Sequence, residues 1–285
     1  MVLGEQPILQ YLVRCEAMID ELDDSAFTAE WEHWHEDHEV RRARPHGFLA
    51  ITGIHWLDAE PQRFADVPGE WSSGLNDVRV LLGDGEELLV DDDRVVGDYR
   101  FHDVDESGVT ARFADAIVEV ARRDGNFMIR PRHPDHVVRA DYRGTPTYPP
   151  SAEWVITGTL RPSDAPRAVT VAATVEGLSH VYESPGEVEF ELEGQVQRLV
   201  AFNGEDPDEL FIVFTDLTAS QTTYGACRFL TVKTPGPDGR VVLDFNRATN
   251  PPCAYTDFAT CPLPPPTNHL PVRVEAGEQL PSMSH

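Results

Sequence analysis

Side chains suited to acid–base chemistry or ligand binding gather in the C-terminal third of this 285-residue chain. Several stand beside apolar runs typical of strands, as in Phe211-Ile-Val-Phe-Thr-Asp216 and Leu243-Asp-Phe-Asn246-Arg. Carboxylates, guanidinium groups and amides at such positions are costly to bury unless they find partners. The polar set comprises Asp216, Thr218, Thr223, Tyr224, Arg228, Asp244, Asn246, Arg247, Asn250, Tyr255 and Asn268.

Two interpretations of this set stay open at the level of sequence. In a pocket, Arg228 or Arg247 would hold an anionic or polar ligand, because guanidinium groups form bidentate contacts with carboxylates and phosphates. Asp216 would then act as a base and Tyr224 as a proton donor. In a structural network, the same charges would pair with one another and fasten the irregular C-terminal segment to the protein body.

The pocket interpretation predicts a set of ligand contacts that also draws on the N-terminal half. There, Trp56 follows a predicted strand and Gly53, although an ordinary core position is the alternative for such a large apolar side chain. The predicted ligand-binding residues are Trp56, Asp216, Tyr224, Arg228, Asn246, Arg247, Tyr255 and Asn268.

Cysteines in the same region have the residue types of a zinc site but not its spacing. Seven residues separate Cys253 from Cys261, and seven more precede His269, whereas structural zinc sites use short Cys-x-x-Cys pairs and four ligands. We predict buried free thiols here, with a disulfide as the alternative, and no metal ligand.

Histidine-rich runs elsewhere predict little chemistry. His33, His35 and His38 lie among acidic residues and do not form His-Glu-x-x-His, which favours a solvated acidic helix. In Arg130-Pro-Arg-His-Pro-Asp-His136, the prolines indicate a turn without defined chemistry. No motif identifies a cofactor.

The composition is strongly acidic, with 49 Asp and Glu against 23 Lys and Arg and a formal net charge of −26. All the cations except Lys233 are arginines. We interpret this as adaptation to a salt-rich cytoplasm, with a site for cations or for a basic partner as the alternative. Binding to nucleic acid or to an anionic membrane is disfavoured, because both need a basic surface. The sequence contains no run of 18 apolar residues and no secretory signal, so we predict a cytoplasmic protein.

The elements that must position these groups change type at Pro45. Two helices are expected before it, at residues 8–23 and from about 25 to 44. Short runs typical of strands follow, separated by turn signals such as Gly83-Asp-Gly and Pro237-Asp-Gly. The predicted strands are residues 47–52, 78–82, 87–90, 109–113, 117–121, 127–130, 137–142, 154–160, 169–175, 188–192, 197–202, 210–214, 228–232 and 241–245.

This pattern predicts a mostly β protein, an antiparallel β-barrel or sandwich with two N-terminal helices. We assign residues 1–44 to a helical segment and residues 45–285 to one β domain. The proline-rich stretch 145–151 is either a long connection or a boundary between two β lobes. Residues 246–271 should form an ordered loop that acts as a lid or plug, because prolines exclude it from the sheet while its Asn, Cys and aromatic residues are untypical of a linker.

Three blocks of sequence carry a resemblance to a known family. They are Gly47-Phe-Leu-Ala-Ile-Thr-Gly-Ile-His-Trp-Leu57, the run from Leu210 through Thr223-Tyr-Gly-Ala-Cys-Arg228, and the tail from Asp244 to Asn268, which Glu275-Ala-Gly-Glu278 follows. The chain resembles, over about residues 40–280, a family of prokaryotic proteins called domain of unknown function 1684. That resemblance implies one mostly β domain and no particular reaction.

The leading functional hypothesis is a small-molecule-binding β protein that holds a polar or anionic molecule in a pocket under the C-terminal loop. One alternative is a hydrolase that uses Asp216, Tyr224 and Arg228. Another is a structural protein in which the polar set only locks the tail. The oligomeric state is left open.

Overall fold

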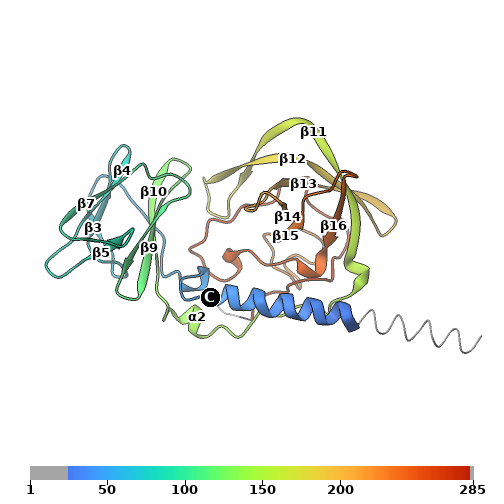
Figure 1. Ribbon diagram of the computed structural model, residues 1–285, viewed down its shortest axis with the longest axis horizontal. Coiled ribbons are helices and arrows are strands. Elements are labelled where there is room, and N and C mark those ends of the chain that lie inside the picture. The colour runs from blue at the N-terminus through green and yellow to red at the C-terminus, as the bar shows by residue number, and fades with distance from the viewer. Residues whose placement is uncertain (1–24, 283–285) are drawn as a thin grey trace, which may run out of the picture.

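A computed structural model describes residues 25–282 and shows two β lobes with a helix packed along the second (Figure 1). The helix covers residues 25–42, as predicted. The other predicted helix, residues 8–23, lies outside the described residues. The mostly β, antiparallel fold expected from the sequence is confirmed. No helix in the described part is long and apolar enough to cross a membrane.

The N-terminal lobe is built from two antiparallel sheets that enclose one core around Trp71, Val80, Leu88 and Phe101. The order in the first sheet is β1-β10-β9-β8-β5-β6, and in the second β2-β3-β4-β7. Their bounds are β1 His55–Trp56, β2 Gln62–Arg63, β3 Glu70–Ser73, β4 Asp77–Leu81, β5 Leu88–Val90, β6 Asp93–Val95, β7 Asp98–His102, β8 Val109–Phe113, β9 Ala116–Arg123 and β10 Asn126–Arg132.

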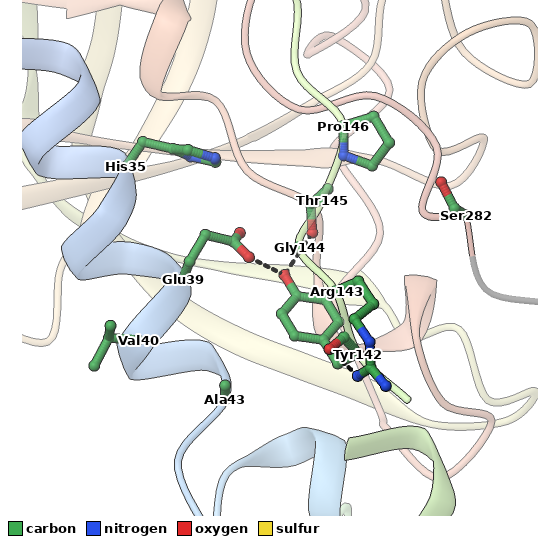
Figure 2. Close-up of a pocket in the computed structure, with 10 residues that line it drawn as sticks. All are labelled: His35, Glu39, Val40, Ala43, Tyr142, Arg143, Gly144, Thr145, Pro146 and Ser282. Atoms are coloured by element: carbon green, nitrogen blue, oxygen red, sulfur yellow. Dashed lines mark hydrogen bonds between the residues drawn. The ribbon is translucent and has the colours of Figure 1, made fainter. Parts of the chain in front are cut away.

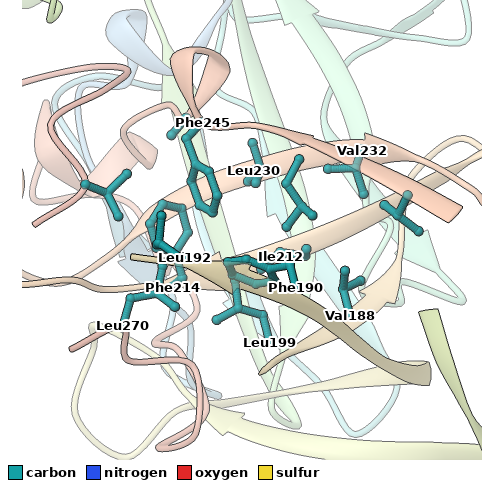
Figure 3. Packing of buried hydrophobic residues seen from close by; sticks show 14 of the residues in the cluster. Val188, Phe190, Leu192, Leu199, Ile212, Phe214, Leu230, Val232, Phe245 and Leu270 are labelled. Carbon is teal, nitrogen blue, oxygen red and sulfur yellow. The ribbon is translucent and has the colours of Figure 1, made fainter. Parts of the chain in front are cut away.

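The C-terminal lobe is a single six-stranded antiparallel sheet that curls into a nearly closed barrel, with β15 close to β16. The strand order is β15-β14-β13-β12-β11-β16. Figure 3 shows its interior, where Val188, Leu199, Ile212, Phe214 and Phe245 pack together. The bounds are β11 Val155–Ala172, β12 Ser179–Leu192, β13 Gln195–Asn203, β14 Glu209–Phe214, β15 Arg228–Lys233 and β16 Arg240–Asp244.

The outer face of β13, β14 and β15 is also apolar, which is unusual for a sheet with one solvated face. Along β14, Leu210, Ile212 and Phe214 point into the barrel, whereas Phe211 and Val213 belong to a second cluster on the other face. This second cluster contains Val171, Val200, Phe202, Val213 and Cys227, with Val169, Tyr182, Phe211 and Phe229 packed against it. The continuous apolar run at 210–214 therefore reflects burial on both faces.

A bend in the β11–β12 hairpin carries part of it out of the barrel toward the N-terminal lobe (Figure 1). The pairing register shifts between Pro162 and Arg167, which marks a bulge. Opposite the bulge, Gly186 has φ +156°, and a Cβ there would lie 2.1 Å from the Arg161 carbonyl oxygen. At the hairpin tip, the Ser179 hydroxyl lies 3.4 Å from a carboxylate oxygen of Asp124 in the other lobe.

The C-terminal segment, residues 245–282, is irregular and well packed, as expected from its prolines. It contains the short 3-10 helices η3 (Phe245–Arg247) and η4 (Pro252–Ala254), and single bridges such as Thr215↔His269 tie it to the barrel. Between residues 45 and 282 the two lobes have separate hydrophobic cores, and the proline-rich stretch 145–151 lies in the connection between them.

Two predicted strands are wrong. Residues 47–52 form η1 (Phe48–Ala50) and an isolated bridge at Ile51, and residues 137–142 contain the short helix α2 (Val137–Ala140). Both segments lie in the connections between the lobes, where their apolar side chains pack on loops instead of a sheet. A further 3-10 turn, η2 (Ala152–Trp154), leads into β11.

Candidate functional site

Asp216 and Arg228, the centre of the predicted polar set, form a buried ion pair that holds the C-terminal segment. An Nη atom of Arg228 lies 3.1 Å from the Asp216 carboxylate, and both side chains are only 1% exposed. Arg228 also donates to the carbonyls of Val274 and Ala276, and Asp216 accepts from the Val274 N–H at 2.7 Å. Burial lowers the pKa of Arg228, although Asp216 opposes this change. One guanidinium meets one carboxylate here, so the charges balance.

Three more predicted residues tie neighbouring segments together. The Asn268 amide bonds to Val200 N–H and to the carbonyls of Val200 and Val213. Asn246 forms a similar pair of bonds with the backbone of Ser151. Arg247 pairs with Asp244 and Glu30 and stacks on Trp34. These contacts fit the structural-network interpretation, because Asn246 and Asn268 satisfy backbone groups of irregular segments, whereas Arg247 pairs with side chains only.

Of the last three predicted residues, Tyr224 and Tyr255 belong to one hydrophobic cluster, and Trp56 lies in the other lobe. Tyr224 donates to the Cys253 carbonyl at 3.0 Å, and Tyr255 is fully buried with its hydroxyl 2.7 Å from Thr145 Oγ1. Trp56 is half-buried on β1 of the N-terminal lobe. The structure therefore does not bring the eight predicted residues together in one site, and none of them lines the cavities described below.

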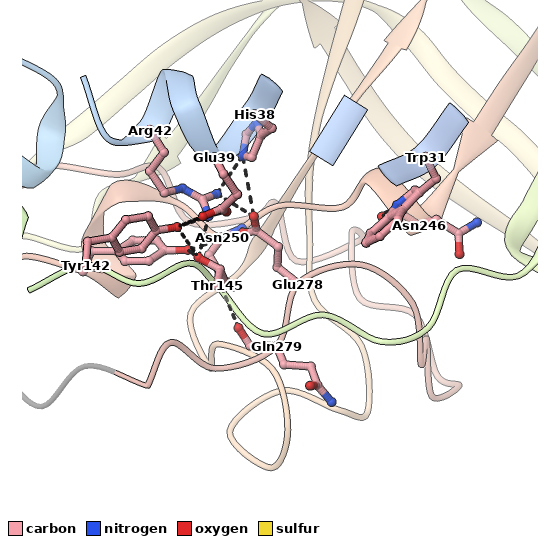
Figure 4. Close-up of polar contacts among 11 residues, drawn as sticks. Trp31, His38, Glu39, Arg42, Tyr142, Thr145, Asn246, Asn250, Glu278 and Gln279 are labelled. Carbon is pink, nitrogen blue, oxygen red and sulfur yellow. Dashed lines mark hydrogen bonds and ion pairs between the residues drawn. The ribbon is translucent and has the colours of Figure 1, made fainter. Parts of the chain in front are cut away.

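A second buried network joins the N-terminal helix to the tail (Figure 4). No sequence pattern predicted it. At its centre, Arg42 donates to Glu278 at 2.6 Å, and both side chains are 2% exposed. Glu278 also accepts the Asn250 N–H at 2.6 Å. Arg42 reaches Glu39, Tyr142 and Thr145 with its other Nη. Burial raises the pKa of Glu278, and Arg42 counteracts this.

This network corrects the prediction of a solvated helix. His35 stacks on the buried Trp31 at 4.9 Å between ring centroids, and His38 Nε2 lies 2.7 Å from an Arg42 nitrogen. Burial and the Arg42 charge lower the pKa of His38 to about 3, so the ring is neutral. The inward face of the helix is therefore packed, and of the three histidines only His33 is largely exposed.

A cavity of about 730 Å³ opens beside this network, between the helix and residues 142–146 (Figure 2). Several of its polar side chains are already engaged, since the Tyr142 hydroxyl donates to Glu39 at 2.5 Å and contacts Thr145 at 2.8 Å. It is also widely open to solvent. It has one guanidinium group among the described residues, that of Arg143, which donates to the carbonyls of Ala140 and Tyr142.

A different cavity, of about 300 Å³, lies between the two lobes, and we call it the arginine cleft. Its N-terminal wall comes from β9, β10 and the 48–51 turn, and its C-terminal wall from β12, β15 and the tail. The lining residues are Phe48, Ile51, Arg123, Arg130, Arg132, His180, Tyr182, Phe229, Pro252, Ala259, Thr260, Cys261 and Pro262.

Three guanidinium groups in the cleft share a single carboxylate. Glu119 accepts hydrogen bonds from Arg123 at 2.9 Å, Arg130 at 2.8 Å and Arg132 at 2.6 Å. The three arginine side chains are between 12% and 23% exposed, so they are shielded from water but not sealed. Burial alone would raise the pKa of Glu119, but Arg130 and Arg132 keep it below its usual value. Burial lowers the pKa of Arg123, and its two arginine neighbours add to this effect.

Strand register explains why these charges meet. Arg130 is the direct cross-strand partner of Glu119, whereas their neighbours Val118, Val120 and Ile129 face the core of the lobe. Arg132 lies two residues further along β10 and Arg123 four residues further along β9, so period-two alternation puts all four on the same face. The predicted turn at Arg130–His136 is wrong in its first part, because Pro131 lies within β10. Charges at alternate positions of an apolar strand were the signal for this site.

The opposite wall is aromatic and comes from the bent hairpin. His180 Nε2 bonds to the Thr260 carbonyl at 2.5 Å, and its ring stacks near Tyr182 at 5.9 Å. Tyr182 stacks in turn on Phe202 at 5.0 Å, and burial raises its pKa to about 12. The cleft thus combines cationic side chains on one lobe with aromatic side chains on the other.

Cys227, Cys253 and Cys261 are free thiols grouped beside this cleft. The Cys253 N–H points at Cys261 Sγ at 3.2 Å, and Cys261 lines the cleft. Burial raises the pKa of Cys227. Among the described residues, no three His, Cys, Asp or Glu side chains are placed to hold a metal ion together.

Comparison with known proteins finds a family model that matches the C-terminal lobe. Residues 140–279 match the family model described as "Protein of unknown function (DUF1684)". The resemblance predicted from the sequence is confirmed for this part of the chain. The match spans just under half of the chain and leaves out residues 40–139 of the expected range. The matched region contains the Asp216–Arg228 pair, Glu278 and the aromatic wall of the cleft. Arg123, Arg130 and Arg132 precede it.

Other comparisons add little to this assignment. No curated protein matches the chain. One solved structure, the solution NMR structure of an uncharacterised protein from Haloarcula marismortui, is 29% identical and covers 52% of this chain and 81% of that one, with a TM-score of 0.43.

Proposed function

We propose that this protein binds a small anionic molecule in the arginine cleft between its lobes. The observation that carries the proposal is the charge imbalance of three guanidinium groups around one carboxylate, Glu119. This local excess of positive charge contrasts with the net charge of the chain, which is −26. Glu106 also interacts electrostatically with Arg123, but the local excess of positive charge is costly, since like charges in a partly dry cleft repel one another.

Guanidinium groups suit this task for geometric reasons. Each presents a planar fork of donors that matches the oxygens of a carboxylate or phosphate, and each keeps its charge when partly buried. The cleft volume of about 300 Å³ is at the lower end of ligand pockets.

The location also agrees with the hypothesis of a pocket bordered by the C-terminal loop, because Pro252, Ala259, Thr260, Cys261 and Pro262 form part of its wall. Asp216, Tyr224 and Arg228 do not support a hydrolase, since Asp216 and Arg228 bond to each other and Tyr224 donates to a carbonyl. For the acidic surface, we propose adaptation to a salt-rich cytoplasm.

The test is calorimetric titration with inorganic phosphate at an ionic strength held constant with sodium chloride. We expect saturable binding by the wild type. The dissociation constant of Arg130→Gln should be at least tenfold higher, because a charge-assisted hydrogen-bonding group is lost. Arg198→Gln is the matched control, since Arg198 forms an exposed pair with Glu189 on the barrel surface. No saturable heat in the wild type, or equal losses in the two variants, would rule out the cleft as an anion site.

A further inference from the structure

A second cavity, of about 590 Å³, adjoins the arginine cleft, and we call it the aromatic groove. The two cavities share three lining residues, Tyr182, Phe229 and Pro262, which form the boundary between them. The groove continues over the outer face of the barrel and is less open than the 730 Å³ cavity beside the helix. Its lining is Tyr182, Asn203, Gly204, Glu205, Glu209, Phe211, Phe229, Thr231 and Pro262.

The groove exists because the outer face of β14 and β15 is aromatic where a solvated sheet would be polar. Phe211 packs edge-on against Phe229 at 4.9 Å between centroids and lies 6.2 Å from Tyr182. These rings are only partly buried. Partly exposed, fixed aromatic rings next to a charged cleft offer contact area at little cost in side-chain entropy.

The charges along the two cavities differ in sign. Arginines dominate the cleft, whereas the far end of the groove carries Glu205 and Glu209, with Glu209 paired to Lys233 at 2.8 Å. An anionic group would therefore be attracted at one end and repelled at the other. A molecule that spans both cavities must have one anionic head and an uncharged body.

Resting on the proposed anion site, we infer that the ligand is an organic anion whose flat, apolar body lies in the aromatic groove while its head meets Arg123, Arg130 and Arg132. Tyr182 and Phe229 contact the junction of head and body, and Phe211 contacts the body. The class includes aryl phosphates and aryl carboxylates with a single charged end.

The experiment compares two probes with the same head, methyl phosphate and 2-naphthyl phosphate, by calorimetric titration at constant ionic strength. We expect naphthyl phosphate to bind the wild type at least tenfold more tightly. Thr231→Trp should abolish this advantage and leave the affinity for methyl phosphate unchanged, because Thr231 is exposed on β15, opposite Phe211, and a large ring there fills the groove but not the cleft. Asn203→Trp, at another exposed groove position, provides a second blocking variant if Thr231→Trp does not fold.

The outcomes separate the two proposals. Equal affinities for the two probes in the wild type would overturn the aromatic groove as a subsite while the anion site stands. An advantage of naphthyl phosphate that survives in both blocking variants would also overturn it, because the body would then lie elsewhere. Binding of neither probe would overturn the anion site itself.

Discussion

The Asp216–Arg228 pair and the arginine cleft both join guanidinium groups to a carboxylate, but the charges balance only in the first. In the barrel wall, one guanidinium meets one carboxylate, both are 1% exposed, and backbone carbonyls take further donors of Arg228. In the cleft, three guanidinium groups meet one carboxylate and all remain partly exposed. Balanced and sealed charges fasten a segment, whereas charges in excess at an accessible surface call for a further partner. Residue type alone does not separate the two cases.

The largest expected effect concerns the sealed pair. Replacing Arg228 with alanine should lower the free energy of unfolding by about 3–5 kcal/mol, because Asp216 would be left charged and unpaired in the interior. Urea denaturation measures this loss. Arg198→Ala, which breaks an exposed pair, should cost less than about 1 kcal/mol. Similar small losses in both variants would mean that the pair does not hold the C-terminal segment.

Glu119→Gln should give an intermediate effect that an added anion reverses. Without the carboxylate, three neighbouring guanidinium groups repel one another, and we expect a loss of about 2 kcal/mol in chloride. Saturating phosphate should recover part of this loss by taking the place of the carboxylate, as seen by thermal denaturation at matched ionic strength.

The matched control for this prediction is Asp216→Asn in the sealed pair. It also removes a carboxylate from an arginine, yet phosphate cannot reach the site, so its stability should not recover. Recovery by phosphate in both variants, or in neither, would erase the distinction between the two regions.

The smallest expected effect is a pH dependence from the helix network. The pKa of His38 falls from 6.5 to about 3 in the folded protein, so the unfolded chain takes up a proton first as the pH falls. The contribution of neutral His38 is therefore fully present above pH 6.5 and is lost as the pH falls toward 3. Between pH 6.5 and 5.5 the loss is about 1 kcal/mol.

His38→Gln should flatten the stability curve over that interval, as measured by urea denaturation at each pH. His33→Gln should leave the curve unchanged, because that side chain is 79% exposed on the outer face of the helix. An unaltered slope in His38→Gln would show that the ring does not stay neutral beside Arg42.

Much of the fold could be predicted from local patterns. Period-two alternation in Val188-Glu-Phe-Glu-Leu-Glu and the turn signals between runs gave the antiparallel β class, and most strand positions follow them. The apolar segments at 47–52 and 137–142 were mistaken for strands, because propensity cannot tell a strand from a short helix packed on a loop. The bend at Gly186 had no clear signal either, since it depends on the approach of Arg161 from the neighbouring strand.

The candidate site could be predicted only in outline. Proline content indicated an ordered tail, and the polar set pointed to its contact with β14 and β15, where the structure places the Asp216–Arg228 lock. The arginine cleft was missed, because its four charges come from positions 119 to 132 and acquire meaning only when β9 pairs with β10 and the hairpin of the other lobe folds over them.

The sequence by itself determined the acidic surface, the β class, the resemblance to DUF1684 and the ordered tail, because composition, periodicity and proline geometry act locally. Only the tertiary structure decided which arginines are neutralised. Arg228 and Arg42 each meet a buried carboxylate from more than ten residues away, whereas Arg123, Arg130 and Arg132 share one. The local charge balance depends on strands that are distant in the sequence, and here it distinguishes a structural ion pair from the proposed anion site.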